Sequence, residues 1–161
     1  MIPTRRHLEF AEGYLGLGLV ALATEELAAI PREDWAKPDV LGARIELHEA
    51  KKEWDMVAGF AEQLARRHPE NSHGWISWGY ALRELNRVGE AQAVLIEAEP
   101  LHGKKEPLIH YNLACYACLL GDHAEARRRL HLAFKMEKKW KMAALEDEDL
   151  KTLWAEVAAI K

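Results

Sequence analysis

Side chains typical of a protein core recur along this chain with the period of an α-helix. His7, Phe10, Ala11 and Tyr14 occupy positions i, i+3, i+4 and i+7, which lie on one face of a helix. No segment alternates apolar and polar residues long enough to indicate a β-strand. Alanine, leucine and glutamate are abundant, and all three favour helix. The pattern therefore predicts an all-α protein.

The same helical pattern returns at a fixed interval. It begins again at Leu41, Trp75 and His110, so the four starting points are separated by 34, 34 and 35 residues. A second apolar stripe begins sixteen residues after each start. The turn between the two helices is expected eleven residues after each start. The four expected turn residues are Gly18, Lys52, Asn86 and Gly121. A period of this length predicts helix–turn–helix repeats that bury their apolar faces against one another.

Prolines mark the ends of the expected helices. Pro3, Pro38 and Pro107 precede or open apolar stretches, and Pro31, Pro69 and Pro100 end them. The predicted helices cover 4–15, 19–30, 38–51, 54–68, 72–85, 88–99, 107–120 and 123–137. A last helix is expected from Asp147 or Asp149 to about Ala159, with an apolar stripe formed by Leu150, Leu153, Trp154 and Val157.

Small and aromatic residues give the repeats a recognisable motif. The clearest examples are Trp75-x2-Trp78-Gly79-x2-Leu82 with Ala91-x3-Leu95, and Leu113-Ala114 with Gly121-Asp122 and Glu125-Ala126. This pattern resembles the tetratricopeptide repeat (TPR) family, although Arg44 occupies a usually apolar position. The resemblance implies a right-handed superhelix, or α-solenoid, of about four repeats within one domain, residues 1–161. The expected repeats are 4–37, 38–71, 72–106 and 107–140, followed by a capping helix at about 147–159.

Composition places the chain among folded proteins of ordinary type. It has 161 residues, of which 49% are hydrophobic and 30% charged, and a net charge of −4. These values disfavour disorder and a generally basic nucleic-acid binder. The apolar run Tyr14–Ala23 is too short to cross a bilayer and makes a poor signal peptide. We therefore expect a cytoplasmic protein without membrane association.

No set of residues matches a known catalytic or metal motif. Cys115-x2-Cys118 lacks the second pair that a zinc site needs, and two cysteines cannot build a disulfide framework. His48-Glu49 is followed by Lys52 where a metalloprotease motif requires histidine. Ser72 and Ser77 are the only serines, and neither lies in a nucleophile motif. We therefore predict no enzymatic activity, no catalytic residues, no cofactor and no metal.

Charge is unevenly distributed along the chain. Residues 101–141 contain nine lysines and arginines against four acidic residues. The basic residues at the end of this stretch are Arg127, Arg128, Arg129, Lys135, Lys138, Lys139 and Lys141. A solvated helix face is the preferred interpretation, and an RNA-binding patch is the alternative.

The TPR resemblance also implies where a ligand would bind, because the first helix of each repeat lines the concave side in that family. The candidate groove residues are Glu12, Glu46, Glu49, His73, Ile76, Tyr80, Arg83, Tyr111, Asn112 and Cys115. We expect a protein-interaction module that binds a peptide or protein segment in this groove, acidic at one end and aromatic at the other. The alternatives are a secretion-type chaperone, or nucleic-acid binding through the basic C-terminal half. Oligomeric state stays open.

Overall fold

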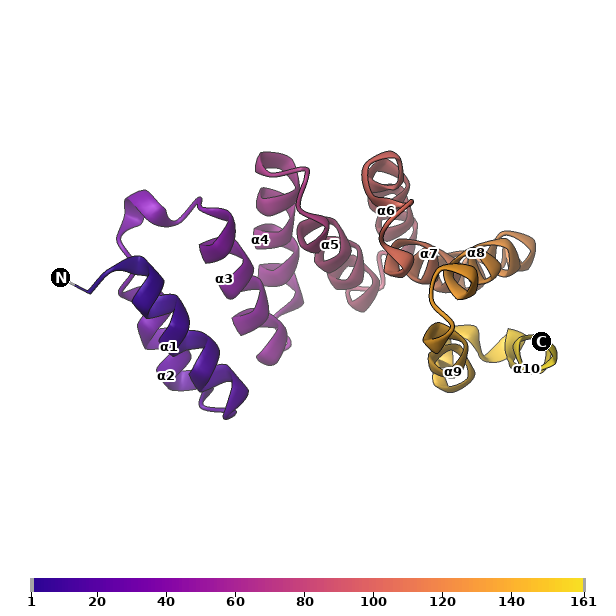
Figure 1. Ribbon diagram of the computed structural model, residues 1–161, viewed down its shortest axis with the longest axis horizontal. Helices are drawn as coiled ribbons and strands as arrows, with labels where there is room; N and C mark the ends of the chain where they lie inside the picture. The colour runs from indigo at the N-terminus through magenta and orange to yellow at the C-terminus, as the bar shows by residue number, and fades with distance from the viewer. Residues whose placement is uncertain (1, 161) are drawn as a thin grey trace. The chain divides into compact units, whose positions relative to one another are not determined.

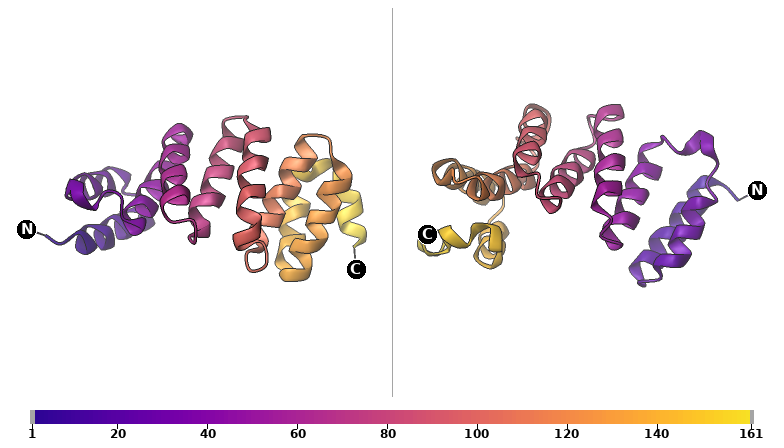
Figure 2. Two further views of the ribbon diagram at one scale, coloured as in Figure 1. Left: turned by 90° about the horizontal axis from the view of Figure 1, so that it is seen from above. Right: turned by 180° about the vertical axis from the view of Figure 1, so that it is seen from behind.

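The structure is a computed structural model that describes residues 2–160. Within this range every regular element is helical, which confirms the all-α prediction. The chain divides into two compact units, residues 1–81 and residues 82–161. We call them unit 1 and unit 2 and describe each by itself; Figures 1 and 2 show the helices of both.

Unit 1 is built from antiparallel helix pairs. Its elements are α1 (Thr4–Gly16), α2 (Val20–Ala28), the 3₁₀ helix η1 (Arg32–Asp34), α3 (Pro38–Ala50), α4 (Trp54–Arg67) and most of α5 (Ser72–Glu84). Helix α1 packs on α2, and α3 packs on α4. The fully buried Ala11 and Ala23 belong to one apolar cluster with Leu27 and Val40. Small side chains at these positions permit close approach of α1 and α2.

Unit 2 contains the last turn of α5 and six further elements. These are α6 (Val88–His102), α7 (Pro107–Leu119), α8 (His123–Met136), α9 (Lys139–Glu146), the 3₁₀ helix η2 (Glu148–Leu153) and α10 (Trp154–Ala159). Helices α7 and α8 form the most extensive pair of this unit, and α6 and η2 both pack on α7. Leu113 and Leu130 are buried between elements, as are Leu150 and Leu153 of η2.

The four predicted turn residues all adopt left-handed backbone conformations. Gly18, Lys52, Asn86 and Gly121 have φ angles of 72°, 55°, 59° and 83°. At each turn the following amide donates to a carbonyl five residues earlier, as in the 2.8 Å bond from Leu19 N to Tyr14 O. The equivalent bonds run from Glu53 to His48, Arg87 to Leu82 and Asp122 to Ala117. One helix-ending motif of the Schellman type therefore recurs in all four repeats.

The structure explains why Arg44 replaces an apolar residue. Its guanidinium carbon lies 4.7 Å from the ring centroid of Trp35 and 5.7 Å from that of Phe60. Nη2 donates to the Leu27 carbonyl oxygen at 3.2 Å. Burial lowers the pKa of Arg44 from its ordinary value. The planar guanidinium of Arg44 thus packs against two aromatic rings at a position that is usually apolar. Its positive charge lies at the C-terminal end of α2, where it is favourable.

Three features differ from the sequence prediction. Helix α6 continues through Pro100 to His102 instead of ending before it. The proline removes a hydrogen bond to the Ile96 carbonyl, and Ile96 is half exposed, so water can replace that bond. The predicted helix from Asp147 or Asp149 is instead 3₁₀ helix η2 followed by α10, and α9 precedes it unpredicted.

Candidate functional site

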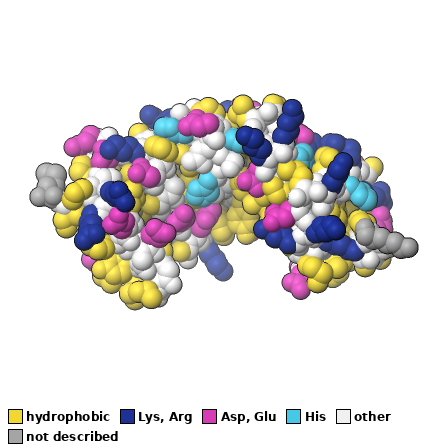
Figure 3. Space-filling view, viewed as in Figure 1, with side chains coloured by type: hydrophobic (Ala, Val, Ile, Leu, Met, Phe, Trp, Pro, Cys, Tyr) yellow, Lys and Arg dark blue, Asp and Glu magenta, His cyan; other side chains and the backbone are white. Residues whose placement is uncertain are grey.

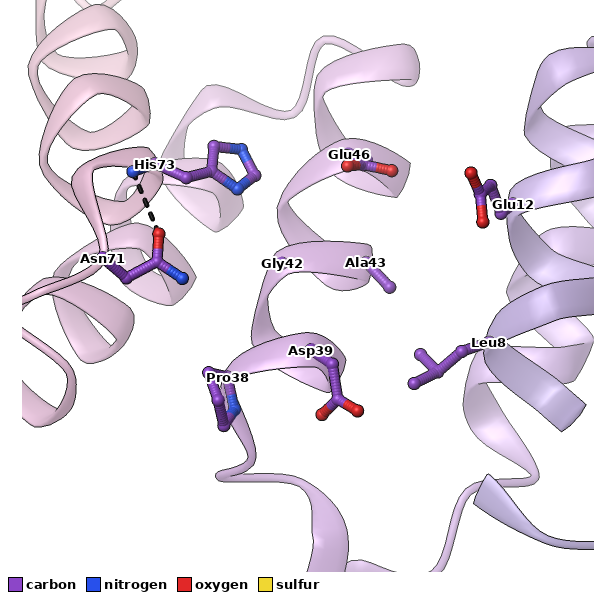
Figure 4. A pocket seen from close by; sticks show the side chains of 9 residues that line it. All are labelled: Leu8, Glu12, Pro38, Asp39, Gly42, Ala43, Glu46, Asn71 and His73. Atoms are coloured by element: carbon purple, nitrogen blue, oxygen red, sulfur yellow. Dashed lines mark hydrogen bonds between the residues drawn. The ribbon is translucent and has the colours of Figure 1, made fainter. Parts of the chain in front are cut away.

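A groove in unit 1 brings together residues from α1, α3 and the first turn of α5. Its volume is about 500 Å³. The residues that line it are Leu8, Glu12, Pro38, Asp39, Gly42, Ala43, Glu46, Asn71 and His73 (Figure 4). Glu12, Glu46 and His73 were expected to share a binding surface, and all three line this groove.

Helical geometry places these side chains. Leu8 and Glu12 are four residues apart on α1, and Gly42 and Glu46 are four apart on α3, so each pair shares one helix face. Figure 4 shows the Glu12 and Glu46 carboxylates on opposite walls, directed toward one another. A Cβ atom at position 42 would lie 3.8 Å from His73 Nδ1. Glycine at this position therefore leaves open the space beside His73 that a side chain would occupy.

The groove is acidic, and two of its carboxylates lack partners. Among residues 2–160, Glu12 and Glu46 make no hydrogen bond or ion pair. Asp39 Oδ1 accepts from the Val40 amide at 2.9 Å, and Asn71 Oδ1 accepts from the His73 amide at 3.0 Å. Figure 3 shows acidic side chains gathered over α1 and α3. Such a groove favours a cationic ligand group, since unpaired carboxylates attract positive charge.

Sequence reasoning missed several residues that line this groove. Asp39 and Ala43 were not among the expected site residues, although Asp39 lies three residues before Gly42 on the same helix face. Asn71 caps the start of α5 beside His73. The spacing of Asp39 and Ala43 along α3 could have indicated that they line the groove. The position of Asn71 depends on how α5 packs on α3, which the spacing does not reveal.

Three other expected groove residues of unit 1 lie outside this cavity. Tyr80 is 43% exposed and packs edge-to-face on Trp54, with ring centroids 5.5 Å apart. Ile76 and Glu49 are half-buried. One cavity therefore contains Glu12 and Glu46 of the expected acidic end, but neither Glu49 nor the expected aromatic part of the site.

In unit 2 the expected groove residues contact the C-terminal part of the same chain. Tyr111 is only 5% exposed, its hydroxyl donates to Asp147 Oδ2 at 2.8 Å, and its ring lies 4.9 Å from that of Trp140. Arg83 Nε donates to Asp149 Oδ2 at 2.8 Å. Tyr111 is therefore covered and does not form an open aromatic floor. Asn112, on the same helix, is half-buried.

The cysteines are also covered by this C-terminal segment. Cys115 Sγ lies 3.7 Å from Asp147 Oδ2, and Cys118 Sγ lies 3.2 Å from Thr152 Oγ1. Burial, followed by the charge of Asp147, raises the pKa of the Cys115 thiol well above its ordinary value. Burial likewise raises the pKa of Tyr111. Both groups therefore stay protonated near neutral pH.

Cys115, Asp147 and Asp149 form a group of metal-ligating types in unit 2. One possible ligand atom from each lies within 4.8 Å of the others. Their polar atoms already have protein partners, because Arg83 pairs with Asp149 and Tyr111 donates to Asp147. The cluster is explained by contacts within the chain.

Most of the predicted basic surface is neutralised by ion pairs. Arg127 pairs with Glu156, Arg128 with Glu125, and Lys139 with Glu137. Arg129 is buried between Glu99 and Glu125. Four of the seven basic side chains therefore already have carboxylate partners, which weakens the attraction of this surface for phosphate groups.

Within residues 2–160, no helix combines the length and apolar character needed to cross a bilayer.

No protein-family model and no curated protein matches the sequence. Solved structures do match. MamA MSR-1 is 21% identical with a TM-score of 0.72, over 86% of this chain and 79% of that one. A structure of MamA AMB-1 is also 21% identical, with a TM-score of 0.71 over 85% and 74% of the two chains.

A further match joins the fold to the sequence motif. TTC0263, described as a thermophilic TPR protein of Thermus thermophilus, is 17% identical with a TM-score of 0.70. The similarity covers 98% of this chain and 100% of that protein. Together with the repeated turns and the 34-residue period, these matches show that the chain has the tetratricopeptide-repeat fold.

Proposed function

We propose that this protein is a non-catalytic interaction module of the cytoplasm, and that the unit 1 groove binds a peptide segment carrying lysine or arginine. The observation that carries the proposal is the pair of unpartnered carboxylates, Glu12 and Glu46, facing one another across the groove. The similarity in fold to TPR proteins supports an interaction role in general.

The chemistry of the groove defines the ligand further. A lysine or arginine side chain entering between α1 and α3 gains two acidic partners at once, which favours charge-assisted hydrogen bonds. Leu8 and Ala43 provide apolar surface beside these carboxylates. A segment with a cationic residue next to an apolar one therefore fits best. The charges mainly raise the association rate and fix the orientation, and the apolar contact slows dissociation.

Matched peptides test this proposal. The probe is an acetylated, amidated nonapeptide with one Lys-Leu pair in a glycine–serine background, and its controls carry glutamine or glutamate in place of lysine. Binding is measured from chemical-shift changes of the Gly42 and His73 amides. We expect the lysine peptide to bind at least tenfold more tightly than either control. Equal binding of the three peptides would overturn the proposal.

Protein variants locate the binding surface. Glu12→Gln and Glu46→Gln should each weaken binding of the lysine peptide, and Gly42→Leu should block it by filling the floor. Glu62→Gln is the matched control, because Glu62 is exposed on α4 and lies outside the groove lining. If Glu62→Gln weakens binding as much as Glu46→Gln does, the effect is one of net charge and the groove is not the site.

A further inference from the structure

Residues 147–153 of unit 2 lie against α7 as a bound peptide would. We call them the docked segment. It begins with Asp147 in an extended conformation and continues as the 3₁₀ helix η2. Besides the C-terminal helices, it packs mainly on α7, and its Asp149 pairs with Arg83, which precedes Asp147 by 64 residues in sequence. In Figures 1 and 2 it is the stretch between α9 and α10.

Two carboxylates of the docked segment are recognised individually. Arg83 approaches both oxygens of Asp149, with Nε 2.8 Å from Oδ2 and Nη2 in contact with Oδ1. This is the two-point geometry that makes arginine selective for carboxylate. Asp147 Oδ2 accepts from the Tyr111 hydroxyl at 2.8 Å, and Cys115 lies beside it. The intervening Glu148 is exposed and pairs with Lys151 of its own segment.

The apolar half of the docked segment is equally well accommodated. Leu150 and Leu153 are fully buried. Thr152 meets Cys118 at 3.2 Å, and Trp154 Nε1 donates to the Asp147 carbonyl oxygen at 3.1 Å. A structural cap needs the leucines, and Asp147 Oδ1 also caps η2 by accepting from the Asp149 amide at 3.0 Å. The added readout of Asp147 and Asp149 by Arg83 and Tyr111 is the chemistry of acidic-motif recognition.

We propose that this face of unit 2, formed by Arg83 and by Tyr111, Cys115 and Cys118 of α7, is a binding surface for an acidic segment of a partner protein. The partner's motif is Asp-x-Asp followed by leucine, and the docked segment is an internal ligand that occupies the surface until the partner replaces it. Covalent attachment gives the docked segment a millimolar effective concentration, so it excludes weak competitors. This surface is separate from the unit 1 groove, and the proposal stands independently of the function proposed for that groove.

The two cysteines provide a direct readout of this exchange. They are the only cysteines in the chain, and both are buried beneath the docked segment. The rate at which a thiol reagent labels the full-length protein therefore reports how often the segment leaves. Asp149→Asn weakens the contact with Arg83, while Glu148→Gln removes the same charge from a neighbouring exposed residue. We expect labelling at least tenfold faster in Asp149→Asn than in the native protein and in Glu148→Gln.

A synthetic peptide tests whether another molecule can take the place of the docked segment. The probe is the acetylated, amidated peptide of residues 145–154, and its control carries asparagine at both aspartate positions. The acidic peptide should bind Asp149→Asn at least tenfold more tightly than the native protein and slow its labelling again. The asparagine peptide should do neither. Arg83→Gln should label fast and gain no protection from the acidic peptide, because the receptor cation is gone.

Several outcomes would overturn the proposal. Labelling that is unchanged in Asp149→Asn would mean that the docked segment does not leave. Fast labelling that the acidic peptide does not slow would mean that the face cannot take a ligand from another molecule. A circular dichroism spectrum showing that Asp149→Asn is unfolded would make the segment an obligatory part of the fold.

Discussion

Arg129 and Glu99 form a two-point ion pair that joins α8 to α6, with Nη1–Oε1 and Nη2–Oε2 distances of 2.6 and 2.9 Å. Arg129 Nε also donates to Glu125 at 2.6 Å, and Nη1 donates to His110 Nδ1 at 3.1 Å. The other ring nitrogen of His110 lies 2.8 Å from the Gly103 carbonyl oxygen, to which it donates. The buried guanidinium of Arg129 therefore joins Glu99, Glu125 and His110 in one hydrogen-bonded network within unit 2.

Arg129→Ala should be strongly destabilising. Removing one partner of a buried ion pair costs about 3–5 kcal/mol because the remaining groups lose their compensation. Arg128 is an adjacent arginine whose side chain is exposed and pairs with Glu125. Arg128→Ala should therefore cost under about 1 kcal/mol. Urea unfolding of both variants measures the difference, and similar losses in the two would show that the Arg129 network adds no stability.

The same network should make stability depend on pH below about 5. Hydrogen bonds from Arg128 and then Arg129 lower the pKa of Glu125 to about 2, and Arg129 lowers that of Glu99. A carboxyl whose pKa is lower in the folded protein stabilises the fold above its unfolded pKa and loses this effect as pH falls. Stability should therefore drop progressively between about pH 5 and pH 2.

Thermal unfolding across this pH range measures the effect. The matched comparison is Arg129→Met, which removes the central cation and should flatten the pH dependence. An Arg129→Met protein whose pH profile parallels that of the native protein would show that other carboxyl groups cause the acid sensitivity.

Lys52→Gly should stabilise the protein by about 1 kcal/mol. Lys52 has a φ angle of 55°, a conformation that costs a residue with a Cβ roughly 1–2 kcal/mol, partly offset by the greater freedom of glycine in the unfolded chain. Gly121→Ala makes the reverse change at an equivalent turn and should destabilise by a similar amount. If the melting midpoints of both variants shift in the same direction, Lys52 and Gly121 do not occupy equivalent turn positions.

Deleting residues 147–161 should cause aggregation or a much lower melting midpoint. The deletion leaves the α7 face bare and removes the buried Leu150, Leu153 and Val157. Burial of each such side chain contributes roughly 1.5–3 kcal/mol. Static light scattering and thermal unfolding measure the outcome. A truncated protein that stays monomeric and equally stable would show that these residues do not cap unit 2.

The sequence predicts those features that depend on spacing along one helix or turn. The repeat spacing located the four turn residues, and the resemblance to the TPR family indicated that Glu12 and Glu46 share a binding surface. It could not predict that Asp147 covers Tyr111, or that Asp149 meets Arg83 from 66 residues away. Those contacts depend on where the chain returns after α8, and helical periodicity carries no information about that path.

Arg44 illustrates the same limit at a single residue. Its position in the repeat marks a core site, and the arginine there departs from the pattern. The partners that accommodate it, Trp35 and Phe60, lie on separate elements. The sequence does not reveal that the rings of Trp35 and Phe60 contact Arg44, because this contact depends on how the elements pack.

Reversing the charge of the unit 1 groove tests the central claim most directly. The measurement compares dissociation constants of the lysine and glutamate nonapeptides for the native protein and for Glu12→Lys/Glu46→Lys, with both proteins confirmed as folded by circular dichroism. Since charge complementarity decides the preference, the native protein should favour the lysine peptide and the variant the glutamate peptide, each by at least tenfold. A variant that keeps the native preference for lysine would contradict the assignment of this groove as the binding site.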